Sequence, residues 1–126
     1  MTTQIDLHPE AIAAYRTTMQ QRGQHEKKIR QEKQVQAHQI AQQAADILRG
    51  EFAATKVVLF GSLAHQRWFS ATSDIDLAVW GLDSGLYFSA VARLQELSSA
   101  FKIDLVDMNN CLDKLCDAIK QEGQAL

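Results

Sequence analysis

Residues 57–79, VVLFGSLAHQRWFSATSDIDLAV, carry two apolar segments, each adjoining polar groups that suit phosphate chemistry. The first segment ends in Gly61-Ser62, where exposed backbone N–H groups and a hydroxyl would bind a phosphate at the start of a helix. The second opens with Asp74 and Asp76, which alternate with apolar residues, so both carboxylates project from one face of a strand. Because like charges repel, the pair predicts either a bound cation or a raised pKa for one carboxyl group.

The composition indicates a single cytoplasmic domain. A chain of 126 residues is long enough to bury one core but leaves no room for a separate substrate domain. The net charge of -2 argues against a general nucleic-acid binder, so we assign the expected phosphates to a small nucleotide. No secretory signal or membrane-spanning stretch is visible, and the spacing of Cys111 and Cys116 suits neither a redox pair nor a zinc pair. We expect free thiols in a reducing cytoplasm, with no membrane partner and no direct nucleic-acid partner.

The hydrophobic pattern predicts an α/β (α+β) fold, in which a small mixed central sheet is flanked by helices. A long helix is expected from Pro9, with Gly23 as a candidate break and Gly50 as its end. Its apolar stripe is narrow before residue 40. This part of the helix therefore either projects from the core, free or packed on a partner, or is simply a solvated first helix.

Three strands and two further helices complete the predicted domain. The strands are expected at residues 56–60, 75–80 and 101–108, and the first two read as central because they are continuously apolar. Residues 86–100 place leucine and valine side chains at helical spacing. A last helix, with Asn109 or Asn110 as its N-cap, ends at Gly123.

Asp104 interrupts the third apolar strand. A charge inside such a strand costs several kcal/mol unless it is paired, hydrogen-bonded or bound to a metal. If this strand lies beside the second, Asp104 meets Asp74 and Asp76 in a nest of three carboxylates. The alternative is an acid paired with Lys102 or Arg93 at a strand edge.

Three carboxylates and a Gly-Ser turn suggest metal-assisted phosphoryl or nucleotidyl transfer, with hydrolysis as an alternative outcome of the same groups. Two Mg²⁺ ions would neutralise the phosphates and orient the attack. The Gly-Ser turn favours transfer, because it would hold the β and γ phosphates of a triphosphate while pyrophosphate leaves the α-phosphorus in line.

Together these motifs resemble the nucleotidyltransferase superfamily related to DNA polymerase β. The shared pattern is a hydrophobic strand ending in Gly-Ser, an Asp-x-Asp some ten residues later and a distant Asp in an apolar strand. Within residues 56–108 it reads Leu59-Phe60-Gly61-Ser62, Asp74-Ile75-Asp76 and Ile103-Asp104-Leu105. The small size and the sequence Ser-Asp-Ile-Asp-Leu-Ala-Val-Trp are similar to the minimal nucleotidyltransferase antitoxins of prokaryotes, which accompany a separately encoded HEPN toxin, a ribonuclease.

The resemblance implies a role for each matching residue and a division of the chain. Residues 1–50 become an N-terminal helical extension and residues 51–126 a minimal nucleotidyltransferase domain. The carboxylates Asp74, Asp76 and Asp104 would be catalytic and would bind the metal ions, with Asp104 also activating the attacking hydroxyl. The nucleotide would be held by Gly61 and Ser62, with Ser73 steadying the carboxylate loop.

The chain departs from the family pattern after Gly-Ser. Family members commonly place an Arg-Gly there, whereas this chain has His65-Gln66 followed by Arg67. Either Arg67 compensates through a shift of the turn, or His65 provides a weaker, pH-dependent donor. An inert, core-facing His65 is an equal alternative.

The function implied by the resemblance is that of an antitoxin in a type VII-like toxin–antitoxin pair. It would be a Mg²⁺-dependent protein adenylyltransferase that moves AMP from ATP to a tyrosine hydroxyl of the HEPN toxin and releases pyrophosphate. Two alternatives remain open. The chain is either a non-catalytic antitoxin that neutralises its partner by binding, or a nucleotidyltransferase acting on a small molecule such as an aminoglycoside.

Overall fold

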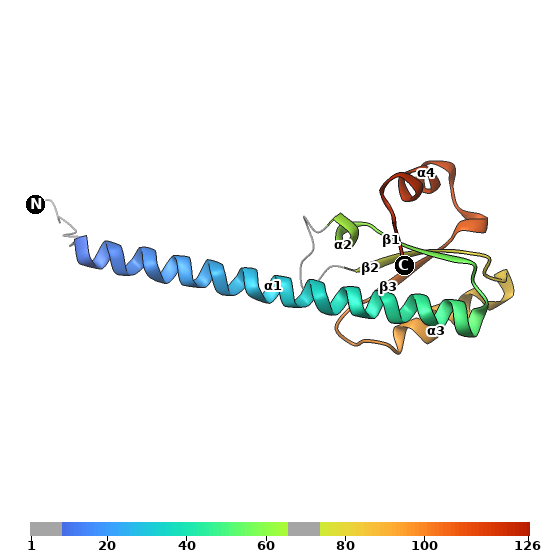
Figure 1. The fold of residues 1–126 in the computed structure, drawn as a ribbon, viewed down its shortest axis with the longest axis horizontal. Helices are drawn as coiled ribbons and strands as arrows, with labels where there is room; N and C mark the ends of the chain where they lie inside the picture. Colours follow the sequence, from blue (N-terminus) through green and yellow to red (C-terminus); the bar gives the residue numbers. More distant parts are fainter. Residues whose placement is uncertain (1–8, 66–73) are drawn as a thin grey trace, which may run out of the picture.

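The computed structural model describes residues 9–65 and 74–126, which fold into a small domain with one long helix (Figure 1). The helices are α1 (Pro9–Phe52), α2 (Ser62–His65), α3 (Tyr87–Gln95) and α4 (Asp113–Glu122). The strands are β1 (Lys56–Phe60), β2 (Ile75–Trp80), β3 (Ile103–Asp107) and β4 (Gln124–Ala125). Two 3₁₀ turns, η1 (Ser84–Leu86) and η2 (Met108–Asn110), precede α3 and follow β3. The predicted α/β (α+β) class is confirmed.

The four strands form one mixed sheet in the order β3-β2-β1-β4. Strands β1 and β2 are antiparallel and occupy the centre, as their apolar sequences predict. Strand β3 pairs with β2 in parallel, with Asp104 opposite Asp76. The third strand therefore lies beside the second, but at the edge of the sheet.

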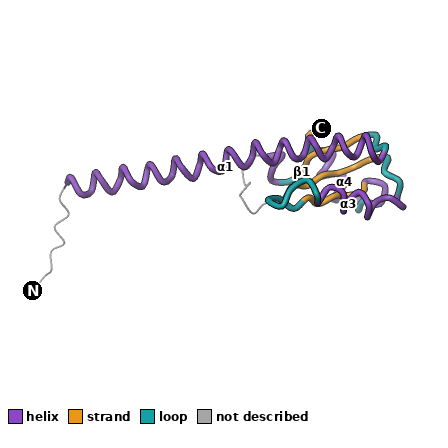
Figure 2. The backbone as a smooth tube through the Cα atoms, turned by 90° about the horizontal axis from the view of Figure 1, so that it is seen from below, coloured by secondary structure: helices purple, strands orange, loops and turns teal. Residues whose placement is uncertain are grey.

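Helices α1 and α3 cover one face of the sheet. The residues of α1 that enter the core are mostly alanine, which brings the helix axis close to the strands, with Ile40 and Leu48 filling the space between them. Leu94 of α3 joins the same core, as do Leu59 and Leu77 from the two central strands. Figure 2 shows α1 lying along the body of the domain and continuing well beyond it.

The opposite face of the sheet has a smaller apolar cluster, covered by α4. Ile119 of α4 packs against Val58 and Ala78 of the central strands. The backbone after α4 then returns to the sheet as β4, which pairs with β1. Because α4 covers the β1 side of this face, the side chains of β3 on the same face stay partly exposed.

The backbone of edge strand β3 is satisfied by two side chains of α3. The Tyr87 hydroxyl donates to the carbonyl oxygen of Leu105 at 2.6 Å, and the Gln95 amide donates to that of Ile103 at 2.5 Å. Unpaired carbonyl groups on an edge strand invite pairing with another strand. These two bonds therefore reduce that tendency beside Asp104.

Two glycine predictions for the long helix were wrong. Gly23 does not interrupt α1, and Gly50 lies inside it, because a glycine in a helix costs only about 1 kcal/mol relative to alanine. The helix ends instead at Phe52, where Ala53 adopts a left-handed φ of 55°. The N–H of Ala54 then donates to the carbonyl of Leu48 at 3.0 Å.

The remaining boundaries differ from prediction at turns. Helix α3 is shorter than the predicted 86–100 and ends at Gln95, after which the N–H groups of Glu96 and Leu97 donate to the carbonyls three residues earlier. Helix α4 begins after Leu112, which has no capping side chain, whereas Asp107 caps η2 by accepting from the N–H of Asn109 at 3.0 Å. Strand β4 was not predicted, because two exposed residues carry no pattern. None of the helices in residues 9–65 and 74–126 is long and apolar enough to cross a membrane.

Replacing Ala53 by Gly is expected to stabilise the protein by about 0.5–1 kcal/mol, because alanine in a left-handed cap is strained and glycine is not. Chemical denaturation of the full chain measures this. Gly50→Ala is the complementary variant, since a Cβ at residue 50 meets nothing within 4 Å. It should add a similar amount through helix propensity. A loss of stability in Ala53→Gly would contradict the left-handed cap.

Candidate functional site

The turn between β1 and α2 forms one side of the candidate site. Gly61 has a left-handed φ of 76°, which only glycine adopts without strain, and its carbonyl accepts from the N–H of His65 at 3.3 Å. Buried Leu63 and Ala64 anchor the short helix that follows. With only four residues, α2 contributes little dipole, so a phosphate bound here would depend on the local N–H groups and the Ser62 hydroxyl.

Asp76 lies directly against this turn. It is opposite Phe60 in the β1–β2 ladder, and its carboxylate packs over the backbone of Gly61. A Cβ added at residue 61 would overlap Oδ2 of Asp76 and lie 3.2 Å from its Cγ. Because Gly61 has no side chain, the carboxylate of Asp76 can pack directly against the backbone of the glycine turn.

The parallel register brings a second carboxylate beside Asp76. Asp104 is its partner across β2 and β3, and both lie on the sheet face that α4 covers only in part. Asp74 immediately precedes β2, two residues from Asp76, and is half-buried. Two distant sequence segments thus contribute carboxylates to this region, and Asp76 is the one that lies against the glycine turn.

The pKa of Asp76 is raised by its surroundings. Burial, followed by the negative charges of Asp104 and Asp74, raises it from 3.8 to about 6. The prediction that one of the clustered carboxyl groups is pushed toward its neutral form is confirmed. A bound cation would reverse the effect, because it favours the ionised form of each carboxylate.

The three carboxylates do not converge on one point. Oδ1 of Asp104 lies 3.6 Å from Nζ of Lys102, so the predicted alternative of a lysine pair at a strand edge is present. Within the described ranges, no group of three acidic, histidine or cysteine side chains is placed to hold a metal ion. The donor set nevertheless fits Mg²⁺ in chemistry, since all its ligands are hard oxygens, and burial followed by the charges of Asp104 and Asp74 raises the Asp76 pKa.

The other predicted nucleotide-binding residues fall into two groups. Nε2 of His65 lies 3.2 Å from a carboxylate oxygen of Glu122, so this imidazole is oriented toward the end of α4. His65 and Glu122 are both substantially exposed, and such a pair contributes little to stability. Arg67 and Ser73 lie outside the described residues, and their roles stay predictions.

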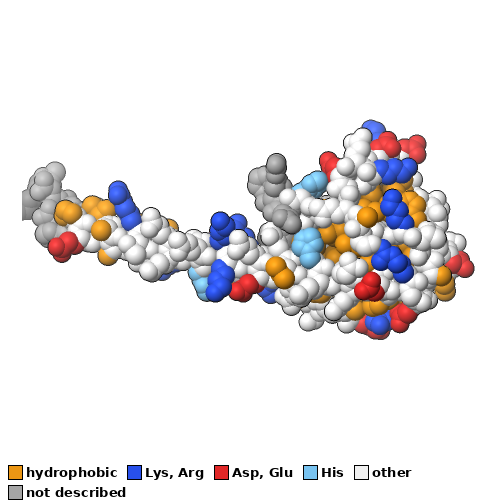
Figure 3. All heavy atoms as spheres, in the orientation of Figure 1, with side chains coloured by type: hydrophobic (Ala, Val, Ile, Leu, Met, Phe, Trp, Pro, Cys, Tyr) orange, Lys and Arg blue, Asp and Glu red, His pale blue; other side chains and the backbone are white. Residues whose placement is uncertain are grey.

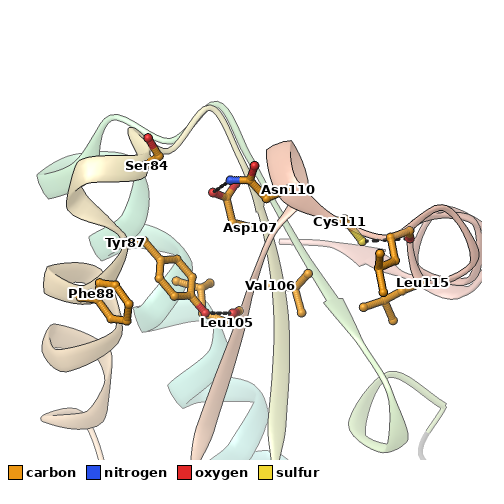
Figure 4. A pocket seen from close by; sticks show the side chains of 10 residues that line it. Ser84, Tyr87, Phe88, Leu105, Val106, Asp107, Asn110, Cys111 and Leu115 are labelled. Carbon is orange, nitrogen blue, oxygen red and sulfur yellow. Dashed lines mark hydrogen bonds between the residues drawn. The ribbon is translucent and has the colours of Figure 1, made fainter.

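An apolar groove of about 430 Å³ adjoins the site along β3 (Figure 4). Val106 of β3 lines the groove and lies two residues from Asp104, on the same face of the strand. Tyr87 of α3 also lines the groove. Leu112 and Phe88 at its rim are more than four-fifths exposed. The groove has no signature in the sequence, because its walls come from segments that only the edge of the sheet brings together.

The two cysteines are free thiols in the structure, as expected. Cys111 lines the groove, where desolvation and the neighbouring Cys116 raise its pKa to about 11. The raised pKa of Cys111 favours its thiol form at neutral pH.

The chain is similar to one known protein family and to several solved structures. The family described as Polymerase beta, Nucleotidyltransferase, matches residues 42–126. None of the curated proteins matches the chain in sequence. A solved toxin–antitoxin complex with AMP-PNP contains a chain 26% identical, with a TM-score of 0.54, and the match covers 64% of this chain and 67% of that one.

Two further solved structures are similar. A mutant of the toxin–antitoxin MntA–HpeT has 26% identity and a TM-score of 0.56, covering 68% of this chain and 69% of the other. A tri-AMPylated Shewanella oneidensis HEPN toxin in complex with MNT antitoxin has 22% identity and a TM-score of 0.54, covering 71% and 70%. At that lower identity the likeness concerns the fold alone. Since the family match spans well over half of the chain and includes the glycine turn and all three carboxylates, this chain belongs to the polymerase beta nucleotidyltransferase family.

Proposed function

We propose that this chain is the antitoxin of a toxin–antitoxin pair and transfers AMP from ATP to a tyrosine hydroxyl of a HEPN ribonuclease toxin. Family membership supports nucleotidyl transfer as the reaction class. The similar complexes described as containing AMP-PNP and a tri-AMPylated HEPN toxin support the nucleotide and the acceptor.

One observation carries the proposal, which is the packing of the Asp76 carboxylate over the Gly61 backbone. It joins a phosphate-binding turn to an acidic cluster within one small volume, as nucleotidyl transfer requires. Gly61 and Ser62 would bind the β and γ phosphates through N–H groups and a hydroxyl. Asp74, Asp76 and Asp104 would hold Mg²⁺, which when bound neutralises phosphate charge and orients the attack.

The reaction balances without an added oxidant or reductant. The acceptor oxygen forms a bond to the α-phosphorus of ATP while the bond from that phosphorus to pyrophosphate breaks. The hydroxyl proton would pass toward a carboxylate, and Asp104 is a candidate because it lies on edge strand β3, on the side of the face that α4 leaves open. Lys102 would have to release Asp104 for this role, which a rotation of its exposed side chain permits.

Labelled ATP, Mg²⁺ and the product of the neighbouring gene test the proposal. Label carried by the α-phosphate should appear on a tyrosine of the partner, and Asp74→Asn should abolish it. Pyrophosphate should accumulate in equal amount. If the label appeared on a small molecule such as an aminoglycoside and not on the protein, the acceptor would be that small molecule. The reaction would still be nucleotidyl transfer.

Neutralisation by binding alone is the second candidate. The ion pair of Asp104 with Lys102, and the lack of a three-carboxylate cluster among the described residues, favour it. It predicts no label on the partner and an Asp74→Asn variant that neutralises the toxin as well as the wild type. That pair of results would refute the catalytic proposal.

A further inference from the structure

The first part of α1 extends away from the rest of the protein. No residue of the helix before Ala37 is buried, so residues 9–36 form a projecting arm roughly 40 Å long at about 1.5 Å per residue. Figures 1 and 2 show this arm leaving the domain. It also lies outside the family match, which begins at residue 42. The arm is therefore an addition to the nucleotidyltransferase fold.

The arm leaves the domain at the end that carries the candidate site. Helix α1 contacts α2, the helix that follows the Gly61 turn, and in Figure 1 α2 lies at the end of the domain nearest the arm. Strand β2 begins at this end with Ile75, next to Asp76. A macromolecule that reaches the carboxylates from this end is thus within reach of the arm.

The arm presents an apolar stripe on the same side as the domain. Ile12, Tyr15 and Met19 are three and four residues apart, and Tyr15 and Met19 are 67% and 48% exposed. Steps of three and four residues continue this line through residues 22, 26, 30 and 33 to the buried Ala37. At residue 33 the direction is explicit, because Nζ of Lys33 lies 5.9 Å from the ring centre of Phe101 in the domain.

The charge of the arm differs from that of the domain. Residues 9–36 contain six Lys or Arg against three Asp or Glu, whereas residues 37–126 contain seven against eleven. Arg22, Arg30 and Lys33 occupy positions along the line of the stripe. Figure 3 shows hydrophobic and basic side chains exposed along the arm. The arm thus suits a surface that offers apolar contacts together with acidic groups.

None of residues 9–36 is buried, so the arm derives little stability from packing against the described part of the domain. A partner that buried the stripe would supply the missing stability. A polynucleotide would neutralise the basic side chains but leave the exposed Tyr15 and Met19 in water. A protein buries both kinds of side chain, and the acceptor is the protein that must come to this end of the domain.

We propose that the arm is a docking element for the acceptor protein: the stripe of Ile12, Tyr15 and Met19 binds the HEPN toxin and holds the acceptor tyrosine at the Asp76 end of the domain. This inference rests on the proposed function for the identity of the occupant. The arm supplies affinity and position, while the chemistry stays with the carboxylates. A loss of the stripe should therefore weaken toxin binding and leave ATP binding intact.

The test uses the full chain with Ile12→Gln, Tyr15→Gln and Met19→Gln combined, since glutamine keeps helix propensity. The matched control is Ala14→Gln with Thr17→Gln, which together with Gln21 presents glutamine at the same spacing on the opposite side. We expect the Kd for the toxin to rise about 100-fold in the triple variant and less than about threefold in the control. The Kd for ATP, the circular dichroism spectrum and the melting temperature of the domain should match in both.

Other outcomes separate the candidates. Equal toxin affinity in the triple variant and the control would overturn docking. Two further results would overturn docking if the affinity for the toxin stayed unchanged. One is that the wild type is a dimer and the triple variant is not. The other is that the wild type binds a labelled RNA and the Arg22→Gln, Arg30→Gln variant does not. If the wild type binds the toxin but transfers no AMP, and the triple variant does not bind, the proposed reaction fails while the docking role stands.

Discussion

Replacing Asp76 by Asn is expected to stabilise the fold and, at the same time, to lower AMP transfer by at least about a hundredfold. The pKa of this carboxyl group is raised to about 6 by burial and by Asp104 and Asp74, so its ionised form is unfavourable in the folded protein. A rise from 3.8 to about 6 corresponds to about 3 kcal/mol without screening, and to about 1–2 kcal/mol for a half-exposed group. Asparagine removes that cost together with a proposed metal ligand.

The pH dependence follows from the direction of the shift. The folded protein binds a proton at Asp76 between pH 6 and pH 3.8, where the unfolded chain does not, so wild-type stability falls as the pH rises through this range. The gain from Asp76→Asn should therefore be full above pH 6 and vanish below about pH 4. Urea denaturation at several pH values, in EDTA, measures it.

Adding Mg²⁺ supplies a second measurement. Ligand that binds only the folded state raises the melting temperature of the wild type, and the variant should lose most of that rise. Asp117→Asn, an exposed carboxylate of α4, is the matched control and should change stability by less than about 0.5 kcal/mol at every pH. A destabilised Asp76→Asn above pH 6 would contradict the crowding of the three carboxylates.

Replacing Gly61 by Ala is expected to destabilise the protein by about 1–3 kcal/mol and to abolish AMP transfer. Part of the cost is the left-handed backbone, which disfavours any Cβ by about 1–2 kcal/mol. The rest comes from the overlap of that Cβ with the carboxylate of Asp76, which must rotate away. When the Asp76 carboxylate rotates, a proposed metal ligand is displaced. The added Cβ also narrows the phosphate-binding turn.

A double-mutant cycle with Asp76→Ala separates the two causes. If the overlap contributes, Gly61→Ala should cost less stability in the Asp76→Ala background, because the colliding oxygen is gone. Gly50→Ala controls for the substitution itself, since it meets no neighbour within 4 Å and should be stabilising. Full additivity of the Gly61 and Asp76 substitutions would show that the carboxylate does not pack on the turn.

Much of the fold was predictable from local pattern. The continuous apolar runs at residues 56–60 and 75–80 predict central strands with the bounds that the structure has. Helix ends were less predictable, because they depend on single contacts. Gly50 reads as a stop but lies inside α1, whose alanine face is held against the sheet until Ala53 turns the chain.

The candidate site was predictable in its residues and not in its arrangement. The alternation around Asp74 and Asp76 predicts a shared face, and the isolated charge of Asp104 in an apolar strand marks it as a functional candidate. The pairing of Asp104 with Lys102 and the orientation of His65 toward Glu122 depend on side-chain rotamers. A periodic pattern in the sequence does not predict side-chain rotamers.

The sequence by itself determined the strands, the glycine turn and the three acidic positions, because periodicity and spacing act within a few residues of each. Only the tertiary structure decided that β3 pairs in parallel with β2, which sets Asp104 beside Asp76 and raises the pKa of that group. It also decided that the arm leaves the domain at the end bearing the site. Both results depend on where distant segments meet, and that is settled by packing across the whole core.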